Sequence, residues 1–465
     1  MTRSSVVVLA LACFLAGIAA TRFLRPSAPA APTDQTVVLG DGLISIYSGR
    51  FREAVTRFTA LIKRDARDPR AYYFRGLAYR ELRALPEAVA DLTRAVELDP
   101  SLSGARYLRA LSRRELGDLP GALADLDVLI AAPNARADMR VLRADLLQEM
   151  ERDREARDDL DHALADKPDS YFALVRRGKL ISRLDDIQKG VKDYDAAIAL
   201  EPRLAAAYVA KAEGLRQLRR HDEAAAAARL ALERLPGRAD VYLLEARIEG
   251  DRYRFDPALA AATAAIGISP KNYEPWIKRA VLYRSAGVSR DEPGKFALAL
   301  LDHDKAVELA PKSAEIYLLR SNTNVWADHL DKALDDAKAA LALDPRSANA
   351  QDALCDVYRM RKEFDKALPA CDKAIDIDPY SASIRITRAL TLEGMDRRRE
   401  ALVDLDKAVK FAPNSVEPWF HRGHMRLRAH RRDDAMADLR KALSLDPGDK
   451  RVQRAMEEAV SAVNF

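Results

Sequence analysis

The sequence predicts an all-α fold, a solenoid of about twelve helix–turn–helix repeats followed by a capping helix. Three observations predict it. Prolines recur at a nearly constant interval, each interval holds two helical patterns, and small residues recur where the paired helices would cross. The interval is 33 to 35 residues in every step but one, which is 41, along this series: Pro100, Pro133, Pro168, Pro202, Pro236, Pro270, Pro311, Pro345, Pro379, Pro413 and Pro447. Such a period is the signature of repeat proteins, whose units cannot bury their apolar faces alone.

The first residues differ from the repeats. Residues 1–25 are predicted to be an N-terminal signal or membrane anchor, and residues 26–34 a Pro/Ala linker. A basic start precedes fifteen uncharged residues, Val6–Ala20, which is the arrangement of a secretory signal. The run is short for a bilayer span of about 20 residues, although Arg22 and Arg25 could snorkel from a longer one. A cleaved signal, an uncleaved anchor and an ordinary hydrophobic first helix all remain open.

Residues 35–447 are predicted to form the solenoid. In the second repeat the helical spacing and the stop are carried by Tyr72, Gly76, Tyr79, Ala88, Leu92, Ala95 and Pro100. The last repeat carries the same pattern in Trp419, Gly423, Ala435, Leu439, Ala442 and Pro447. The 41-residue step adds seven residues between Gly287 and Phe296, which we expect to form a longer turn. Residues 448–465 are predicted to be a C-terminal capping helix over the apolar face of the last hairpin.

This pattern resembles the tetratricopeptide repeat family, in proteins of bacterial type, over about residues 35 to 447. The resemblance implies a right-handed superhelical solenoid in which the first helix of each unit lines a concave groove. It also implies that protein or peptide segments bind in this groove. The candidate partner-binding residues are Tyr73, Arg80, Tyr107, Arg114, Arg216, Arg284, Asn322, Trp326, Arg359, Phe420 and His424. Trp326 is expected either to anchor a partner or to pack against a neighbouring unit.

An arginine and an aspartate recur sixteen residues apart in the repeats, with the separation lengthened by seven where the insertion falls. Eight units hold both partners: Arg75–Asp91, Arg109–Asp125, Arg143–Asp159, Arg177–Asp193, Arg279–Asp302, Arg320–Asp336, Arg388–Asp404 and Arg422–Asp438. Two units lose both partners together, one of them at Leu354 and Ala370. This joint presence and loss predicts a ladder of structural ion pairs inside the hairpins. The alternative is a ladder of arginines that awaits an anionic ligand.

The chain has only three cysteines, so no disulfide framework dominates the fold. Cys355 and Cys371 keep the sixteen-residue separation in the unit that lost its ion pair at Leu354 and Ala370. They are expected to form either a disulfide between the two helices of that unit or two small buried thiols.

The sequence predicts a binding protein and not an enzyme. The net charge of +5 is small, with 76 Lys and Arg against 71 Asp and Glu, and gives no case for nucleic acid. No motif for catalysis, a cofactor or a metal stands out. His421 and His424 are three apart on a predicted helix, but they are expected on its solvated side.

The predicted function is a protein–protein interaction scaffold or adaptor that binds partner segments in the groove. The alternative is a binder of an anionic envelope polymer or lipid headgroup through the groove arginines, and a third possibility is a structural spacer. The predicted localisation is exported or inner-membrane-anchored with the solenoid on the periplasmic side, and the alternative is cytoplasmic. An uncleaved anchor would place the N-terminus in the membrane.

Overall fold

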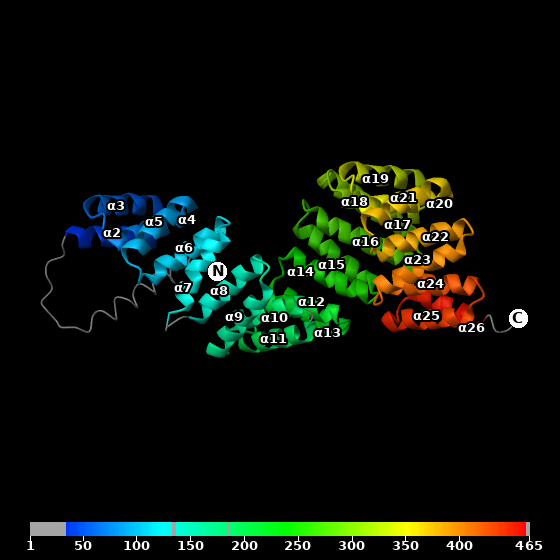
Figure 1. Ribbon diagram of the computed structural model, residues 1–465, viewed down its shortest axis with the longest axis horizontal. Coiled ribbons are helices and arrows are strands. Elements are labelled where there is room, and N and C mark those ends of the chain that lie inside the picture. The colour runs from blue at the N-terminus through cyan, green and yellow to red at the C-terminus, as the bar shows by residue number, and fades with distance from the viewer. Residues whose placement is uncertain (1–33, 133–135, 185, 462–465) are drawn as a thin grey trace. The chain divides into compact units, whose positions relative to one another are not determined.

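The computed structural model describes residues 34–132, 136–184 and 186–461. Within these residues all regular secondary structure is α-helical, as predicted (Figure 1). The chain divides into two compact units, residues 1–210 (unit 1) and 211–465 (unit 2), with the boundary inside one helix. The signal or anchor predicted for residues 1–25 lies outside the described residues. Among the helices that are described, none combines the length and the apolarity needed to cross a membrane.

Consecutive helices pair into hairpins, and successive hairpins stack on one another. Unit 1 comprises α2 (Asp34–Tyr47), α3 (Phe51–Arg64), α4 (Pro69–Glu81), α5 (Leu85–Leu98), α6 (Ser103–Glu115), α7 (Leu119–Ile130), α8 (Ala137–Glu149), α9 (Asp153–Asp166), α10 (Tyr171–Arg183) and α11 (Ile187–Leu200). The unit boundary falls within α12 (Ala205–Gln217).

Unit 2 continues with α13 (His221–Arg234), α14 (Ala239–Asp251), α15 (Phe255–Ile268), α16 (Tyr273–Arg290), α17 (Gly294–Leu309), α18 (Ala314–Trp326), α19 (Leu330–Leu343), α20 (Ala348–Met360), α21 (Phe364–Ile377), α22 (Ala382–Gly394), α23 (Arg398–Phe411), α24 (Val416–Arg428), α25 (Arg432–Leu445) and α26 (Lys450–Ser461). The first helices of successive hairpins, α14 to α24, contact one another in sequence. As predicted, the C-terminal helix α26 packs Val452 and Ala455 against Leu439 and Ala442 of the last hairpin.

Small residues let the two helices of a hairpin approach closely, as the sequence predicts. A Cβ atom at Gly76 would lie 2.8 Å from Leu92 Cγ, and one at Gly423 would lie 3.0 Å from Leu439 Cγ. At the crossing of α10 and α11, a Cβ atom at Gly190 would lie 2.6 Å from the carbonyl oxygen of Gly178. A larger side chain at these positions would therefore force the helices apart.

The insertion in the eighth repeat differs from the prediction of a longer turn. It lengthens helix α16 to 18 residues and helix α17 to 16 residues, and leaves a turn of only three residues, 291–293. The helix continues because Val288, Ser289 and Arg290 contain no helix breaker, and it ends where Asp291 adopts a left-handed backbone at φ 57°. The extra turn of α16 carries Arg290 to Asp256 of α15, with an N–O distance of 3.1 Å.

The ladder of ion pairs is confirmed in all eight predicted units. The arginine nitrogens and aspartate oxygens are 2.5–3.2 Å apart, and every one of the eight aspartates is buried. Since these carboxylates already satisfy the arginines, the alternative of a ladder that awaits an anionic ligand is wrong.

Most of these arginines also bind the preceding repeat, which the sequence analysis missed. The Nη1 atom reaches back sixteen residues to an oxygen on the second helix of the previous hairpin. The acceptors are Thr59, Asp127, Asp161, Thr263, Asp304, Asp372 and Asp406. Each such arginine therefore joins three helices, and the ladder fixes the stacking of repeats as well as the closure of each hairpin.

A buried histidine makes the stability of unit 2 dependent on pH. His303 in α17 is fully buried, and its Nε2 atom lies 3.1 Å from Thr323 Oγ1. Burial, and then the charges of Arg284 and Arg320, lower the pKa of His303 to about 3. The unfolded chain takes up this proton near pH 6.5, whereas the folded chain does so only near pH 3. The contribution of His303 to the free energy of unfolding is therefore fully present above pH 6.5 and is lost as the pH falls towards 3.

We expect His303→Gln to remove part of this acid sensitivity. Between pH 7.5 and pH 5 the wild type should lose about 2 kcal/mol more unfolding free energy than the variant, because glutamine takes up no proton. Urea denaturation at the two pH values measures this difference. The control is His329→Gln, which replaces an exposed histidine. Equal acid sensitivity of the wild type and His303→Gln would contradict the prediction.

Candidate functional site

Unit 2 encloses a cavity of about 1630 Å³, lined mainly by the first helices of its hairpins. The repeats curve until the turn after α14 meets the turn after α25 (Figure 1). There the Tyr253 hydroxyl donates a hydrogen bond of 2.9 Å to Asp446 Oδ2, and Arg219 lies 3.4 Å from the same oxygen. The contact of Tyr253 with Asp446 joins residues 193 positions apart, and the two contacts close the mouth of the cavity along one edge. The groove predicted from the sequence is therefore, in unit 2, a partly closed chamber.

Arginines near the ends of several first helices pair with an acid of the next repeat. Arg80 lies 2.5 Å from Glu115, Arg114 contacts Glu149, and Arg216 lies 2.9 Å from Asp251. All three pairs are 35 residues apart. This 35-residue spacing was not predicted from the sequence, because it joins consecutive repeats and is independent of the sixteen-residue spacing within each hairpin. Three candidate groove arginines are thus already neutralised by carboxylates, and Arg359 is likewise 2.5 Å from Asp356 of its own helix.

Arg284 departs from this arrangement. Among the described residues it has no carboxylate partner, and its Nη1 atom donates a hydrogen bond of 2.8 Å to Asn322 Oδ1. The position that holds the acid in the other pairs is occupied by Trp326 in the repeat after Arg284. Burial lowers the pKa of Arg284, which still keeps its charge because arginine titrates far above neutral pH. Arg284 is therefore a cation of the cavity wall that has no counter-ion among the described residues.

Trp326 packs against a neighbouring unit, as one of the two expectations had it, and its role as a partner anchor stays a prediction. Its ring stacks on Phe296 with the centroids 6.5 Å apart, yet half of the residue stays exposed and it lines the cavity. Because tryptophan is the residue type most often found at the energetic centre of interfaces, an exposed ring beside an unpaired arginine is a candidate binding anchor.

Among the candidate groove residues of unit 1, the structure corrects Tyr73. Tyr73 is 3% exposed, because it packs against Phe74 with ring centroids 4.8 Å apart and lies beneath Gly104 of the next hairpin. Tyr107 is half-buried between two core clusters. These tyrosines stabilise the stack of repeats, and Tyr73 offers no surface to a partner.

Phe420 and His424 both lie on α24. The Phe420 ring centroid is 6.0 Å from that of His424 and 5.4 Å from the Arg451 guanidinium of α26. Burial alone would raise the pKa of Glu417, but hydrogen bonds from His421 and Arg451 outweigh it and lower the pKa to about 2. Phe420 lines the cavity, whereas His424 does not. The described residues contain no group of three or more His, Cys, Asp or Glu placed to hold a metal ion.

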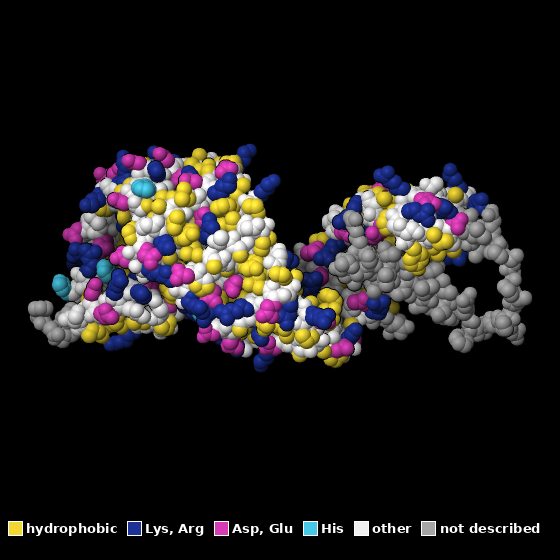
Figure 2. All heavy atoms as spheres, turned by 180° about the vertical axis from the view of Figure 1, so that it is seen from behind, with side chains coloured by type: hydrophobic (Ala, Val, Ile, Leu, Met, Phe, Trp, Pro, Cys, Tyr) yellow, Lys and Arg dark blue, Asp and Glu magenta, His cyan; other side chains and the backbone are white. Residues whose placement is uncertain are grey.

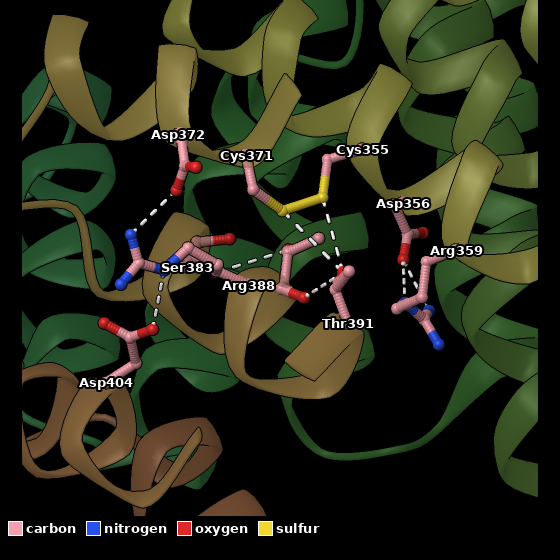
Figure 3. Close-up of a disulfide and its surroundings, with 10 residues drawn as sticks. Cys355, Asp356, Arg359, Cys371, Asp372, Ser383, Arg388, Thr391 and Asp404 are labelled. Carbon is pink, nitrogen blue, oxygen red and sulfur yellow. Dashed lines mark hydrogen bonds and ion pairs between the residues drawn. A yellow bond between two sulfur atoms is a disulfide. The ribbon is translucent and has the colours of Figure 1, made fainter. Parts of the chain in front are cut away.

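Cys355 and Cys371 form a disulfide between α20 and α21 (Figure 3). They occupy the positions at which Gly76 and Leu92 pack in the second repeat, so a covalent bond replaces a packing contact. Thr391 Oγ1 lies 3.5 Å from Cys355 Sγ and 3.7 Å from Cys371 Sγ. Figure 3 shows the disulfide between the ladder residue Arg388 on one side and the Asp356–Arg359 pair on the other. The bond thus stiffens one of the repeats that lack an Arg–Asp pair, next to the cavity residue Asp356.

The outer surface gives no sign of a nucleic-acid site on the face that Figure 2 shows. Lysine and arginine side chains are interspersed there with aspartate and glutamate, and no continuous basic surface forms. A nucleic-acid site normally has a concentrated basic patch. The cavity of unit 2 is therefore the best candidate for a binding site.

Stacked helical hairpins with a lined inner face define a repeat scaffold of the kind that binds protein or peptide partners. The tetratricopeptide repeat family model matches residues 42–103 and 327–382, so these two segments of the chain match tetratricopeptide repeats. No curated protein matches the sequence.

Several solved structures are similar to the chain at low sequence identity. Yeast Tom70 is 18% identical with a TM-score of 0.48, over 92% of this chain and 95% of that one. The Cut9–Hcn1 hetero-tetramer of the APC/C is 13% identical with a TM-score of 0.40, over 92% and 96%. A tetratricopeptide repeat protein from Parabacteroides merdae is 18% identical with a TM-score of 0.41, over 63% and 99%.

Proposed function

We propose that this protein is a scaffold that binds an extended protein segment in the cavity of unit 2, with Arg284 and Trp326 as the central contacts. The observation that carries the proposal is the unpaired charge of Arg284 beside a half-exposed tryptophan, at the point where other repeats place an ion pair. Arg284 is partly buried, and a cation that has lost part of its solvation without gaining a counter-ion is stabilised when a ligand supplies one. A cavity of about 1630 Å³ exceeds the size of most small-molecule sites and has room for a chain segment.

Binding of an anionic polymer through a row of groove arginines receives less support. Of the five arginines that this alternative would use, four already have carboxylate partners in the structure: Arg80, Arg114, Arg216 and Arg359. Breaking these pairs would cost free energy before a polymer could bind. We therefore expect binding to weaken only modestly between low and physiological salt, in contrast to the steep loss expected of a polyanion.

Peptides selected from a random library against the full-length protein test the proposed site. We expect Trp326→Ala to weaken the selected peptides roughly 30-fold, which corresponds to a hot-spot loss of about 2 kcal/mol. The matched control is Leu301→Ala on α17, since Leu301 is 65% exposed and does not line the cavity. Melting curves of both variants separate lost binding from lost folding. Unchanged affinity of Trp326→Ala would contradict the proposed site.

We also propose that the N-terminal segment exports the protein or anchors it in a membrane, with the solenoid on the oxidising side. The apolar run at residues 6–20 supports this, and so does the Cys355–Cys371 disulfide, because disulfides persist mainly in oxidising compartments. A fusion of residues 1–34 to alkaline phosphatase tests the proposal in a bacterial host, since that reporter is active only after export. An inactive but stable fusion would argue for a cytoplasmic protein.

A further inference from the structure

A second hollow of about 370 Å³ adjoins the cavity on the first helices of three consecutive repeats, α18, α20 and α22. The charged residues that line it are acidic, Glu315, Asp352 and Asp356, and among the described residues no lysine or arginine belongs to its lining. Leu318, Val325 and Val357 supply apolar walls. Its volume lies at the lower end of the range for ligand pockets, about 300–1000 Å³.

Asp352 is the unusual member of this lining. Its Oδ1 atom is shielded from solvent and has no hydrogen-bond partner among the described residues. Asp356, by contrast, is paired with Arg359 at 2.5 Å. Burial raises the pKa of Asp352 to about 7, although a hydrogen bond from Thr387 acts in the opposite direction. Buried polar atoms in native proteins almost always have a partner, so this oxygen calls for one that the chain itself does not supply.

We propose that this hollow, the Asp352 pocket, binds the ammonium or guanidinium group of a lysine or arginine side chain on the partner segment. The inference rests on the proposed function, since the side chain belongs to the segment that lies in the cavity. The cation would supply the missing donor to Asp352 in a charge-assisted hydrogen bond, while its methylene stem packs against Leu318 and Val357. A metal ion is a poorer fit because the described residues place no metal-binding group there.

The Asp352 pocket is continuous with the site at Arg284 and Trp326. Asn322 and Thr387 line both hollows, and Asn322 also accepts the hydrogen bond from Arg284. One extended segment can therefore place a basic side chain against Asp352 while its neighbouring residues contact Trp326. The unpaired cation and the unpaired carboxyl on one wall would then fix the direction in which the segment lies.

This recognition predicts a pH dependence with a definite sign. A cation binds the ionised carboxylate, so the affinity for a lysine-containing peptide rises as the pH increases through about 7, and binding below pH 7 releases a proton. The charged groups that face Asp352 are Glu315 from α18 and Asp356 with Arg359 from α20. The residues of α22 at the pocket, Ser383 and Thr387, do not titrate in this range.

Peptides selected from the same kind of library, again on the full-length protein, test the proposal. We expect lysine or arginine to be enriched at one position of the selected peptides. Replacing that residue with norleucine, which keeps the stem and removes the charge, should weaken binding to the wild type roughly 10- to 100-fold. It should have little effect on binding to Asp352→Asn. The control Asp335→Asn removes the same charge from the exposed face of α19 and should behave as the wild type.

The outcomes distinguish the pocket from the proposed function. The Asp352 pocket is contradicted if the peptides selected by the wild type show no preference for lysine or arginine. It is also contradicted if replacing the basic residue with norleucine weakens binding to Asp352→Asn as much as to the wild type. In either case the proposed binding of peptides in the cavity is unaffected. If the wild type selects no peptides, the proposed function fails and the pocket fails with it. The pH profile of wild-type binding needs no variant, and an affinity that does not change between pH 6 and pH 8 would overturn the assignment of Asp352.

Discussion

Replacing Asp125 with alanine should lower the unfolding free energy by about 3–5 kcal/mol, the cost of leaving a buried partner charge uncompensated. Asp125 is 2% exposed and accepts hydrogen bonds from Arg109 at 2.5 and 2.9 Å. It accepts another at 2.8 Å from Arg113. The substitution therefore leaves two arginines without their carboxylate. Urea denaturation followed by circular dichroism measures the loss.

The matched control is Asp127→Ala on the same helix. Asp127 is about half-exposed where it pairs with Arg143, so its removal should cost no more than about 1 kcal/mol. The double variant Arg109→Ala with Asp125→Ala should lose less than the sum of the two single losses, because each single variant already breaks the same contact. Additive losses would show that the two residues do not stabilise the fold through each other.

Removing the disulfide should cost unit 2 about 3 kcal/mol, because the bond closes a loop of sixteen residues in the unfolded chain. Replacing both Cys355 and Cys371 with alanine should therefore lower the midpoint of urea unfolding. Dithiothreitol should lower the wild-type midpoint by a similar amount. It should leave the midpoint of the double-alanine variant unchanged, which controls for other effects of the reductant.

A thiol count gives a direct check on the same bond. In denaturant without reductant, the full chain should show no more than one reactive thiol, that of Cys13. Two or three reactive thiols would mean that Cys355 and Cys371 are not bonded. In that case the stability of this repeat would rest on the packing of the two side chains alone.

The sequence predicts the ion-pair ladder but not which groove residues are exposed. All eight Arg–Asp contacts follow from a spacing that repeats, because a feature that recurs in most units is detectable without coordinates. The groove residues follow the same register, yet Tyr73 is buried while Trp326 is half exposed. Position within the repeat cannot distinguish Tyr73 from Trp326, because the exposure of each side chain depends on how the next hairpin packs over it.

The unpaired residues of the candidate site were harder to predict from the sequence. Arg284 looks like the other groove arginines in the sequence, and only the pairing of its equivalents with acids 35 residues later shows that its own partner is missing. That spacing is readable in the sequence once the structure reveals it. Asp352 offers no such signal, because the lack of a partner for its oxygen arises from three helices that meet around it.

The amino-acid order by itself determined the helical hairpin, its period and the salt bridges within it, because these depend on residues close together in the chain and are repeated many times. The stacked structure decided which side chains stay open to a partner and that Tyr253 meets Asp446 across 193 residues. It also decided that the two cysteines are bonded. Small rotations between neighbouring repeats add up along the stack, so contacts between distant repeats depend on every interface between them.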